Sequence, residues 1–148
     1  MKTQVVWFKR DLRLSDHAAL AEAAKLGPVL PLIMVEPEYW QLPDTSARQW
    51  EFWRGCIVEL GREIAAQGGQ LMIRKGAATD ILEDLHSRIG SFDLWSHEET
   101  GNAWTYRRDL AVKAWRGVMT SLGGSGDSSE LRVDGRRTAI IGLSAGIK

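Results

Sequence analysis

The stretch that most constrains the fold is PVLPLIMV at residues 28–35, which is a nearly continuous apolar run. A strand with one solvent-facing side would alternate apolar and polar residues, so this run indicates a strand buried on both faces. Strands of that kind occur in parallel sheets covered by helices on either side. Pro31 cannot donate a backbone hydrogen bond, and we therefore expect it near the start of this strand or on an exposed edge.

Strand-like and helix-like segments alternate along the first 115 residues. Further strands are predicted at residues 4–8, 70–74 and 92–96, and helices at 17–26, 47–67, 78–89 and 104–115. Four repeats of strand and helix favour an α/β fold, a Rossmann-like parallel sheet with right-handed crossovers and helices on both faces.

The helices show the periodicity expected of segments that pack on a sheet. One helix is predicted to turn Trp50, Trp53, Ile57, Leu60 and Ile64 toward the core, and the next Ile81, Leu82, Leu85 and Ile89. Ser15 and Asp16 are good N-cap residues for the first helix, with His17 as a solvated helix residue.

Composition divides the chain into two parts. Residues 1–115 are predicted to form the α/β domain, whereas residues 116–148 are rich in glycine and serine and lack periodicity. We interpret this tail as disordered or as the product of a shifted reading frame.

Bulk properties exclude several classes of protein. Nineteen basic residues balance nineteen acidic ones, so bulk charge does not drive nucleic-acid binding. A single cysteine, Cys56, permits no internal disulfide and no cysteine-based metal cluster. No apolar run approaches the roughly 20 residues that span a bilayer, and the N-terminus lacks the pattern of a secretory signal. The chain is therefore expected in the cytoplasm, with no membrane partner.

Charged and aromatic residues gather where the predicted strands end, and ligands of parallel α/β folds bind at that edge. The first strand leads into KRDLR, in which Asp11 either pairs with Arg10 or Arg13 to fix the turn, or leaves the arginines to face an anionic or aromatic ligand. A G-x-G-x-x-G motif is lacking there, which argues against a dinucleotide site.

Other local signals are weaker. His97, Glu98 and Glu99 follow the fourth strand, but one histidine with adjacent carboxylates is poor evidence for a metal site, and none is predicted. Trp104 is the best candidate for stacking on a ligand. Neither a catalytic triad nor an acid/base carboxylate pair is recognisable, so local chemistry indicates a ligand-binding domain without a catalytic residue.

Two segments, VVWFKRDLRLSDHAAL and SHEETGNAWTYRRDLAVKAW, resemble the N-terminal α/β domain of the DNA photolyase and cryptochrome family. The family pattern W-F-R-x-D-L-R-x-x-D stands here from Trp7 to Asp16. The second segment is similar through Arg108, Asp109 and Val112. The likeness covers residues 4–115 and extends to the order of the predicted elements.

The resemblance implies an antenna function, in which the α/β domain binds a light-harvesting lumazine, deazaflavin or folate. Thr105 stands where folate-binding members carry a glutamate, which disfavours folate. The segment SHEETGN is closer to the sequences of a bacterial cryptochrome-like subgroup that uses a lumazine antenna. In that subgroup Glu36 would be a polar contact of the pigment. The candidate cofactor-binding residues are Phe8, Arg10, Asp11, Glu36, Glu98 and Trp104.

In the family, FAD, DNA contacts and light-driven repair belong to a C-terminal helical domain. The resemblance therefore implies a chain truncated before its catalytic half and inactive alone, with a reading-frame shift near Trp115 as one explanation. The alternatives are a free-standing nucleotide- or flavin-binding α/β module, or a non-functional fragment.

Overall fold

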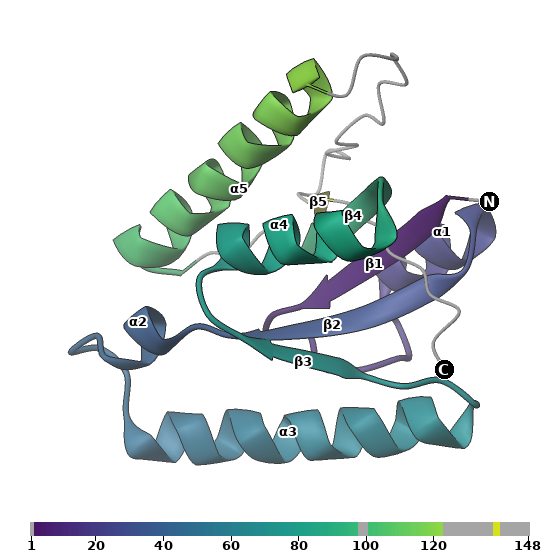
Figure 1. Ribbon diagram of the computed structural model, residues 1–148. Coiled ribbons are helices and arrows are strands. Elements are labelled where there is room, and N and C mark those ends of the chain that lie inside the picture. Colours follow the sequence, from purple (N-terminus) through teal and green to yellow (C-terminus); the bar gives the residue numbers. More distant parts are fainter. Residues whose placement is uncertain (1, 98–100, 123–137, 140–148) are drawn as a thin grey trace.

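The computed structural model describes residues 2–97, 101–122 and 138–139 (Figure 1). In chain order the elements are β1 (Thr3–Phe8), α1 (Ala18–Leu26), β2 (Val29–Val35), α2 (Pro37–Trp40), α3 (Ala47–Ala66), β3 (Met72–Lys75), α4 (Ala78–Ile89), β4 (Phe92–His97), α5 (Ala103–Leu122) and β5 (Thr138–Ala139).

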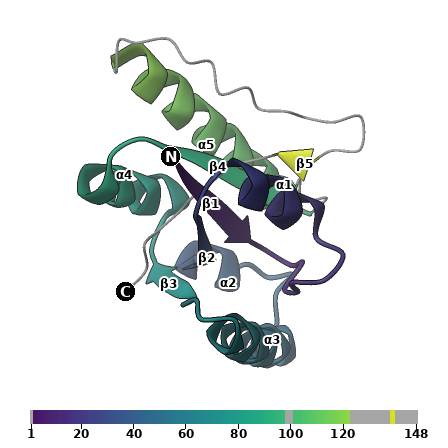
Figure 2. The ribbon, with the colours of Figure 1, turned by 90° about the vertical axis from the view of Figure 1, so that its right-hand side faces the viewer.

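The strands form one sheet in the order β3-β2-β1-β4-β5. The first four strands are parallel, and the two residues of β5 pair antiparallel with the carboxyl end of β4. Helices α1 and α3 lie on one side of the sheet, and α4 and α5 on the other (Figures 1 and 2). The Rossmann-like fold predicted from the alternating pattern is confirmed.

The strand order reverses at β1. The chain runs outward from β1 through β2 to β3 and then returns to place β4 on the other side of β1. Loops on the two sides of β1 consequently diverge at the carboxyl edge, and this switch point is where open α/β sheets bind ligands.

Strand β2 is buried as its apolar run predicts. Its five central residues are all buried, and only its two ends are partly exposed. Pro31 is the third residue of this strand and lies opposite Val6 of β1, whereas pairing with β3 begins one residue later, at Leu32. The missing N–H of Pro31 therefore falls near the start of the strand, as expected.

Helix α3 begins with a capping box. The Ser46 hydroxyl accepts from the backbone N–H of Gln49 at 3.2 Å, and the Gln49 side chain accepts from the N–H of Ser46 at 3.0 Å. Ile57, Leu60 and Ile64 are buried against the sheet, as their spacing predicts. The bounds of α4 match the predicted helix, and α3 ends one residue earlier than predicted.

Three expectations about the helices are wrong. The N-cap of α1 is His17 rather than Ser15 or Asp16, because Nδ1 of its ring accepts from the Leu20 N–H at 3.0 Å. Ile89 is 40% exposed, since the last residue of α4 has already turned away from the sheet. Helix α5 continues past Trp115 to Leu122, so the change in composition there does not end the helix.

The remainder of the predicted tail, residues 123–137 and 140–148, lies outside the described residues. Among the helices that the structure does describe, none combines the length and the apolarity needed to cross a bilayer.

A buried amide joins β1 to β4 near the amino edge of the sheet. Gln4 is 1% exposed; its Nε2 donates to Asp93 Oδ2 at 2.8 Å, and its Oε1 accepts from Trp95 Nε1 at 2.7 Å. The Gln4 side chain of β1 thus supplies an acceptor for the Trp95 N–H of β4, and Asp93 of β4 accepts from the Gln4 amide.

Replacing this amide tests its contribution to stability. Gln4→Leu keeps the approximate volume but leaves the Trp95 N–H without its acceptor, so the free energy of unfolding should fall by about 1–3 kcal/mol. Urea denaturation measures the change, with Gln70→Leu in the exposed turn before β3 as the control. Equal stabilities of the two variants would contradict this role of Gln4.

Candidate functional site

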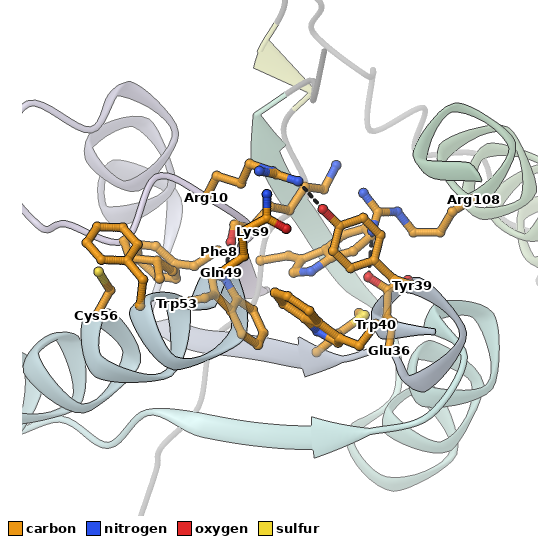
Figure 3. A pocket seen from close by; sticks show the side chains of 14 residues that line it. Phe8, Lys9, Arg10, Glu36, Tyr39, Trp40, Gln49, Trp53, Cys56 and Arg108 are labelled. Atoms are coloured by element: carbon orange, nitrogen blue, oxygen red, sulfur yellow. Dashed lines mark hydrogen bonds and ion pairs between the residues drawn. The ribbon is translucent and has the colours of Figure 1, made fainter. Parts of the chain in front are cut away.

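An aromatic cavity, called the main cavity below, lies at the carboxyl ends of β1 and β2 and has a volume of about 190 Å³ (Figure 3). It is bounded by β1, β2, the loop after β1, the short helix α2, the first turns of α3, and α5. Six of its lining residues are aromatic: Trp7, Phe8, Tyr39, Trp40, Phe52 and Trp53.

The aromatic wall comes mainly from α2 and α3. Rings of Tyr39 and Trp40 are 5.0 Å apart between centroids, and those of Trp40 and Trp53 are 5.4 Å apart. Nε1 of Trp53 donates to the backbone carbonyl of Lys9 at 2.8 Å, which ties α3 to the loop after β1. None of the four residues of α2 is buried, so this helix contributes side chains to the lining of the cavity and none to the buried core.

A buried ion pair forms the polar end of the cavity. Nη1 of Arg108 on α5 lies 2.5 Å from Oε1 of Glu36 at the end of β2, and each side chain is 8% exposed. Nε of Arg108 also donates to Asp109 Oδ1 at 3.0 Å. Charges buried to this extent need such partners, because an unpaired charge there would cost several kcal/mol.

Two cations flank the indole of Trp7 in the cavity floor. Lys9 Nζ is 4.4 Å from the ring centroid, and the Arg108 guanidinium carbon is 4.9 Å from it. Lys9 also donates to the His97 carbonyl and to Asp109, each at 3.2 Å. The lysine of the KRDLR loop thus connects β1 to β4 and α5. At the cavity mouth the exposed Arg10 donates to the hydroxyl of Tyr39.

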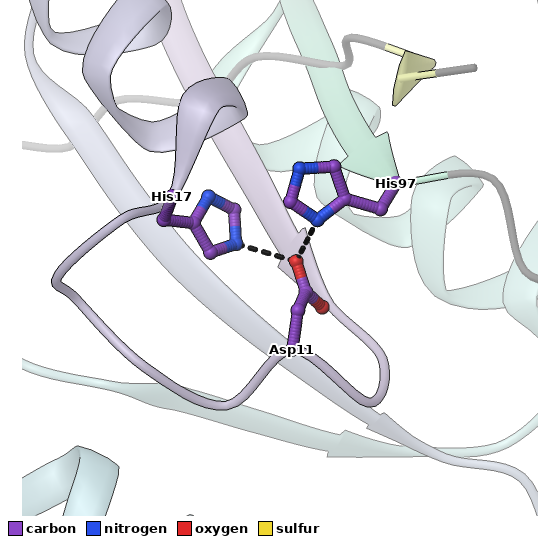
Figure 4. A group of neighbouring side chains, drawn as sticks. All are labelled: Asp11, His17 and His97. Atoms are coloured by element: carbon purple, nitrogen blue, oxygen red, sulfur yellow. Dashed lines mark hydrogen bonds and ion pairs between the residues drawn. The ribbon is translucent and has the colours of Figure 1, made fainter. Parts of the chain in front are cut away.

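Asp11 points to two histidines instead of the cavity (Figure 4). Its Oδ2 lies 2.5 Å from Nε2 of His17 and also contacts Nδ1 of His97, while its Oδ1 accepts from the Lys9 N–H at 3.2 Å. Burial by itself raises the pKa of Asp11, but the contacts with His17 and His97 outweigh it and hold the pKa well below its ordinary value. Asp11 is therefore ionised, and the partners that the structure shows for its carboxylate are His17, His97 and the Lys9 N–H, whereas the interpretation of a fixed turn expected Arg10 or Arg13.

His17 is buried at 4% exposure, so the prediction of a solvated helix residue is wrong. Its partner in the cluster, His97, lies 86 residues from Asp11 in sequence. The sequence does not predict this cluster, because nothing in the spacing of the three residues indicates that they meet.

The three side chains could in principle hold a metal, because their ligand atoms lie within 4.8 Å of one another. The hydrogen bond at Nδ1 of His17 argues against metal binding. Nδ1 accepts from the Leu20 N–H, so a neutral ring carries its proton on Nε2, the atom that faces Asp11. That nitrogen has no lone pair for a metal, and the cluster is a carboxylate in contact with two imidazoles.

A second cavity of about 460 Å³ lies behind the ion pair. Glu36 and Arg108 line both cavities. Trp104 and Arg107 of α5 line the second cavity together with the residues that begin α4. Trp104 approaches the main cavity through Tyr39, at 5.6 Å between ring centroids.

The structure brings half of the predicted site residues together. Phe8, Arg10 and Glu36 line the main cavity, Trp104 lines the second, and Asp11 belongs to the histidine cluster. Glu98 lies outside the described residues. Their role as cofactor-binding residues stays a prediction.

The sequence analysis did not single out Tyr39, Trp40 or Trp53 as site residues. The signal for the first two was present in EPEYW, which follows β2 at the ligand edge of the sheet. Trp50 and Trp53 were assigned to the core, but both are only partly buried, and Trp53 lines the cavity.

Fold and cavity together define a Rossmann-like α/β domain with an aromatic cavity beside the switch point of its sheet. The family model for DNA photolyase matches residues 4–121. The chain therefore belongs to the DNA photolyase family, and the resemblance seen in the two sequence segments is confirmed.

Individual relatives support this membership. The chain is 30% identical to a cryptochrome DASH of Oryza sativa subsp. japonica, over 86% of this chain and 23% of that protein. It is 36% identical to a deoxyribodipyrimidine photo-lyase of Agrobacterium fabrum, over 67% of this chain and 21% of that protein. The chain thus spans about a quarter of the length of these relatives.

A solved structure shares the fold. The bacterial class III photolyase from Agrobacterium tumefaciens matches with a TM-score of 0.63 and 28% identity, over 83% of this chain and 25% of that chain. An archaeal photolyase from Sulfolobus tokodaii, solved with two FAD molecules, matches with a TM-score of 0.60 at 20% identity.

The low pKa of Asp11 makes stability depend on acidity. Its folded pKa lies below the unfolded value of about 3.9, so its contribution is complete above that pH and is lost as the pH falls toward the folded pKa. Asp11→Asn should lower the free energy of unfolding at neutral pH by about 2 kcal/mol, and the difference should shrink in acid.

Urea denaturation across the acid range measures this effect. Asp84→Asn, on the exposed face of α4, is the control and should follow the wild-type acid dependence. A constant difference between Asp11→Asn and wild type at all pH values would contradict the proposed ionisation.

Proposed function

We propose that this chain is the light-harvesting domain of a photolyase- or cryptochrome-type protein and binds a flat heteroaromatic pigment in the main cavity. The observation that carries the proposal is the cavity itself, with six aromatic residues around a buried Glu36–Arg108 pair. Aromatic side chains favour stacking on a planar ring, and a few convergent polar groups orient it.

The polar end suits a ring with a pyrimidinedione edge, as in lumazines and deazaflavins. Such an edge presents carbonyl acceptors and an imide N–H donor. Arg108 can donate to a carbonyl and Glu36 can accept from the N–H, so this pair would bind the edge while Trp40 and Trp53 contact the faces. The resemblance implied Glu36 alone as the polar contact of the pigment, and the ion pair adds Arg108 to it.

Folate fits less well. Thr105, the position at which folate-binding members carry a glutamate, is fully buried, and its hydroxyl donates to the Asn102 carbonyl at 2.9 Å within the first turn of α5. That position therefore supplies no carboxylate, and we favour a lumazine or a deazaflavin.

The proposed role in a whole protein is energy transfer to an FAD bound elsewhere. DNA binding and repair would depend on that FAD-containing region, and we expect no lyase activity from these 148 residues alone.

Titration with 6,7-dimethyl-8-ribityllumazine, followed by its absorption and emission, tests the proposal. The wild-type chain should bind it, and Glu36→Gln should weaken binding by about tenfold, which corresponds to about 1.4 kcal/mol for one charged hydrogen bond. Glu59→Gln, exposed on α3, is the matched control and should bind as the wild type does. Cooperative thermal melts of both variants establish that the fold is retained.

Other outcomes select the alternatives. Retention of an adenine nucleotide in place of the pigment would support a free-standing nucleotide-binding module. A chain that binds neither lumazine, deazaflavin nor nucleotide would overturn the antenna role and favour a non-functional fragment.

A further inference from the structure

The outward face of α3 has a residue pattern that reads the same in both directions from Gly55. Residues of one kind recur seven, four and three positions before and after this glycine. These pairs are Arg48 with Arg62, Glu51 with Glu59, and Phe52 with Val58. Offsets of three, four and seven residues place side chains on one face of a helix, and every member of the pattern is exposed. Gly55 and these six residues are called the α3 face below.

The centre of the α3 face is apolar and exposed. Phe52 is 75% exposed and Val58 is 47% exposed. Gly55 lies between them, and a Cβ atom added there would meet no side chain or distant backbone atom of the described residues within 4 Å. The packing of the single chain therefore does not require this glycine, although a glycine inside a helix costs about 1 kcal/mol relative to alanine. A glycine at this point does allow the backbone of a second helix to approach closely.

The charges of the α3 face are little used within the chain. Among the residues that the structure describes, Arg48, Glu59 and Arg62 form no ion pair. Glu51 contacts Arg54 at 3.5 Å, but the two side chains are 66% and 63% exposed, and such a pair contributes little to stability. The α3 face thus presents charges of both signs that remain available to a partner.

We infer that the α3 face joins two copies of this chain in a two-fold symmetric dimer, with the two α3 helices antiparallel and crossing at Gly55. In such a contact, a residue before Gly55 meets a residue after Gly55 of the other copy. The pattern fits this symmetry, because Phe52 and Val58 surround the crossing while the charges lie toward its ends. An apolar centre with a polar rim is the usual anatomy of a protein interface. The inference goes beyond the proposed function and does not rest on the pigment.

Opposite charges become neighbours in this arrangement. Arg48 is seven residues before the crossing and Glu59 of the partner subunit is four residues after it, so the two stand about 4.5 Å apart along the helix axis. Arg62 and Glu51 of the partner subunit are related in the same way. Within one chain, Arg48 and Glu59 are 11 residues apart, or about 16 Å along the helix, and cannot pair. The ion pairs therefore form only between copies.

Sedimentation equilibrium of the full chain tests the dimer. At micromolar concentrations the wild type should have twice the 16.5 kDa mass of one chain. Gly55→Leu should weaken dimerisation about tenfold or more, because its side chain fills the space at the crossing. The same change should not unfold the single chain, since it enters open space and improves helix propensity.

Ala21→Leu is the matched control, because Ala21 is exposed in the middle of α1 and lies outside the α3 face. This variant should dimerise as the wild type does. A wild type that stays monomeric up to its solubility limit would overturn the inference, and so would a Gly55→Leu variant that dimerises as tightly as the wild type.

A charge exchange tests the antiparallel register. Arg48→Glu and Glu59→Arg each place like charges together in the dimer, so each variant alone should dimerise several-fold more weakly than the wild type. An equimolar mixture of the two variants should form heterodimers, because every changed charge then meets its opposite. A chain that carries both changes should likewise regain dimerisation. If neither the mixture nor the double variant recovers it, the proposed contact is wrong.

Both positions are exposed, so these substitutions should leave the thermal melt of the single chain nearly unchanged.

Discussion

The buried pair of Arg108 and Glu36 is the interaction on which the arrangement of the site depends. It links α5, which packs beside α4 on one side of the sheet, to the end of β2. The same guanidinium bonds Asp109, which accepts from Lys9, so the connection continues to β1 and β4. The buried guanidinium of Arg108 thus connects α5, β2, β1 and β4 at the carboxyl edge of the sheet, and it lines both cavities.

This network explains why the loop after β1 carries charges where nucleotide-binding folds carry glycines. Its lysine and aspartate are used internally: Lys9 connects β1 to β4 and α5, and Asp11 binds His17 and His97. A glycine-rich turn allows a backbone to approach a phosphate, whereas this turn is rigidified by its own side chains. The cavity it borders is accordingly aromatic and not a cradle of backbone N–H groups.

The fold was largely predictable because apolar periodicity reports directly on burial. The bounds of α4 and the double-sided burial of β2 both follow from such patterns. The site was less predictable for two physical reasons. A helix face that lines a cavity has the same periodicity as one that packs in the core, which is why Trp53 was assigned to the core. The cluster of Asp11, His17 and His97 depends on long-range geometry, and a histidine that caps a helix looks like any other polar residue in sequence.

The short helix α2 has a consequence for how such domains diversify. It contributes Tyr39 and Trp40 to the cavity but no buried residue to the core. Substitutions in this segment can therefore reshape the cavity at little cost in free energy of unfolding. The shape of the cavity can consequently change while the sheet beneath it stays the same.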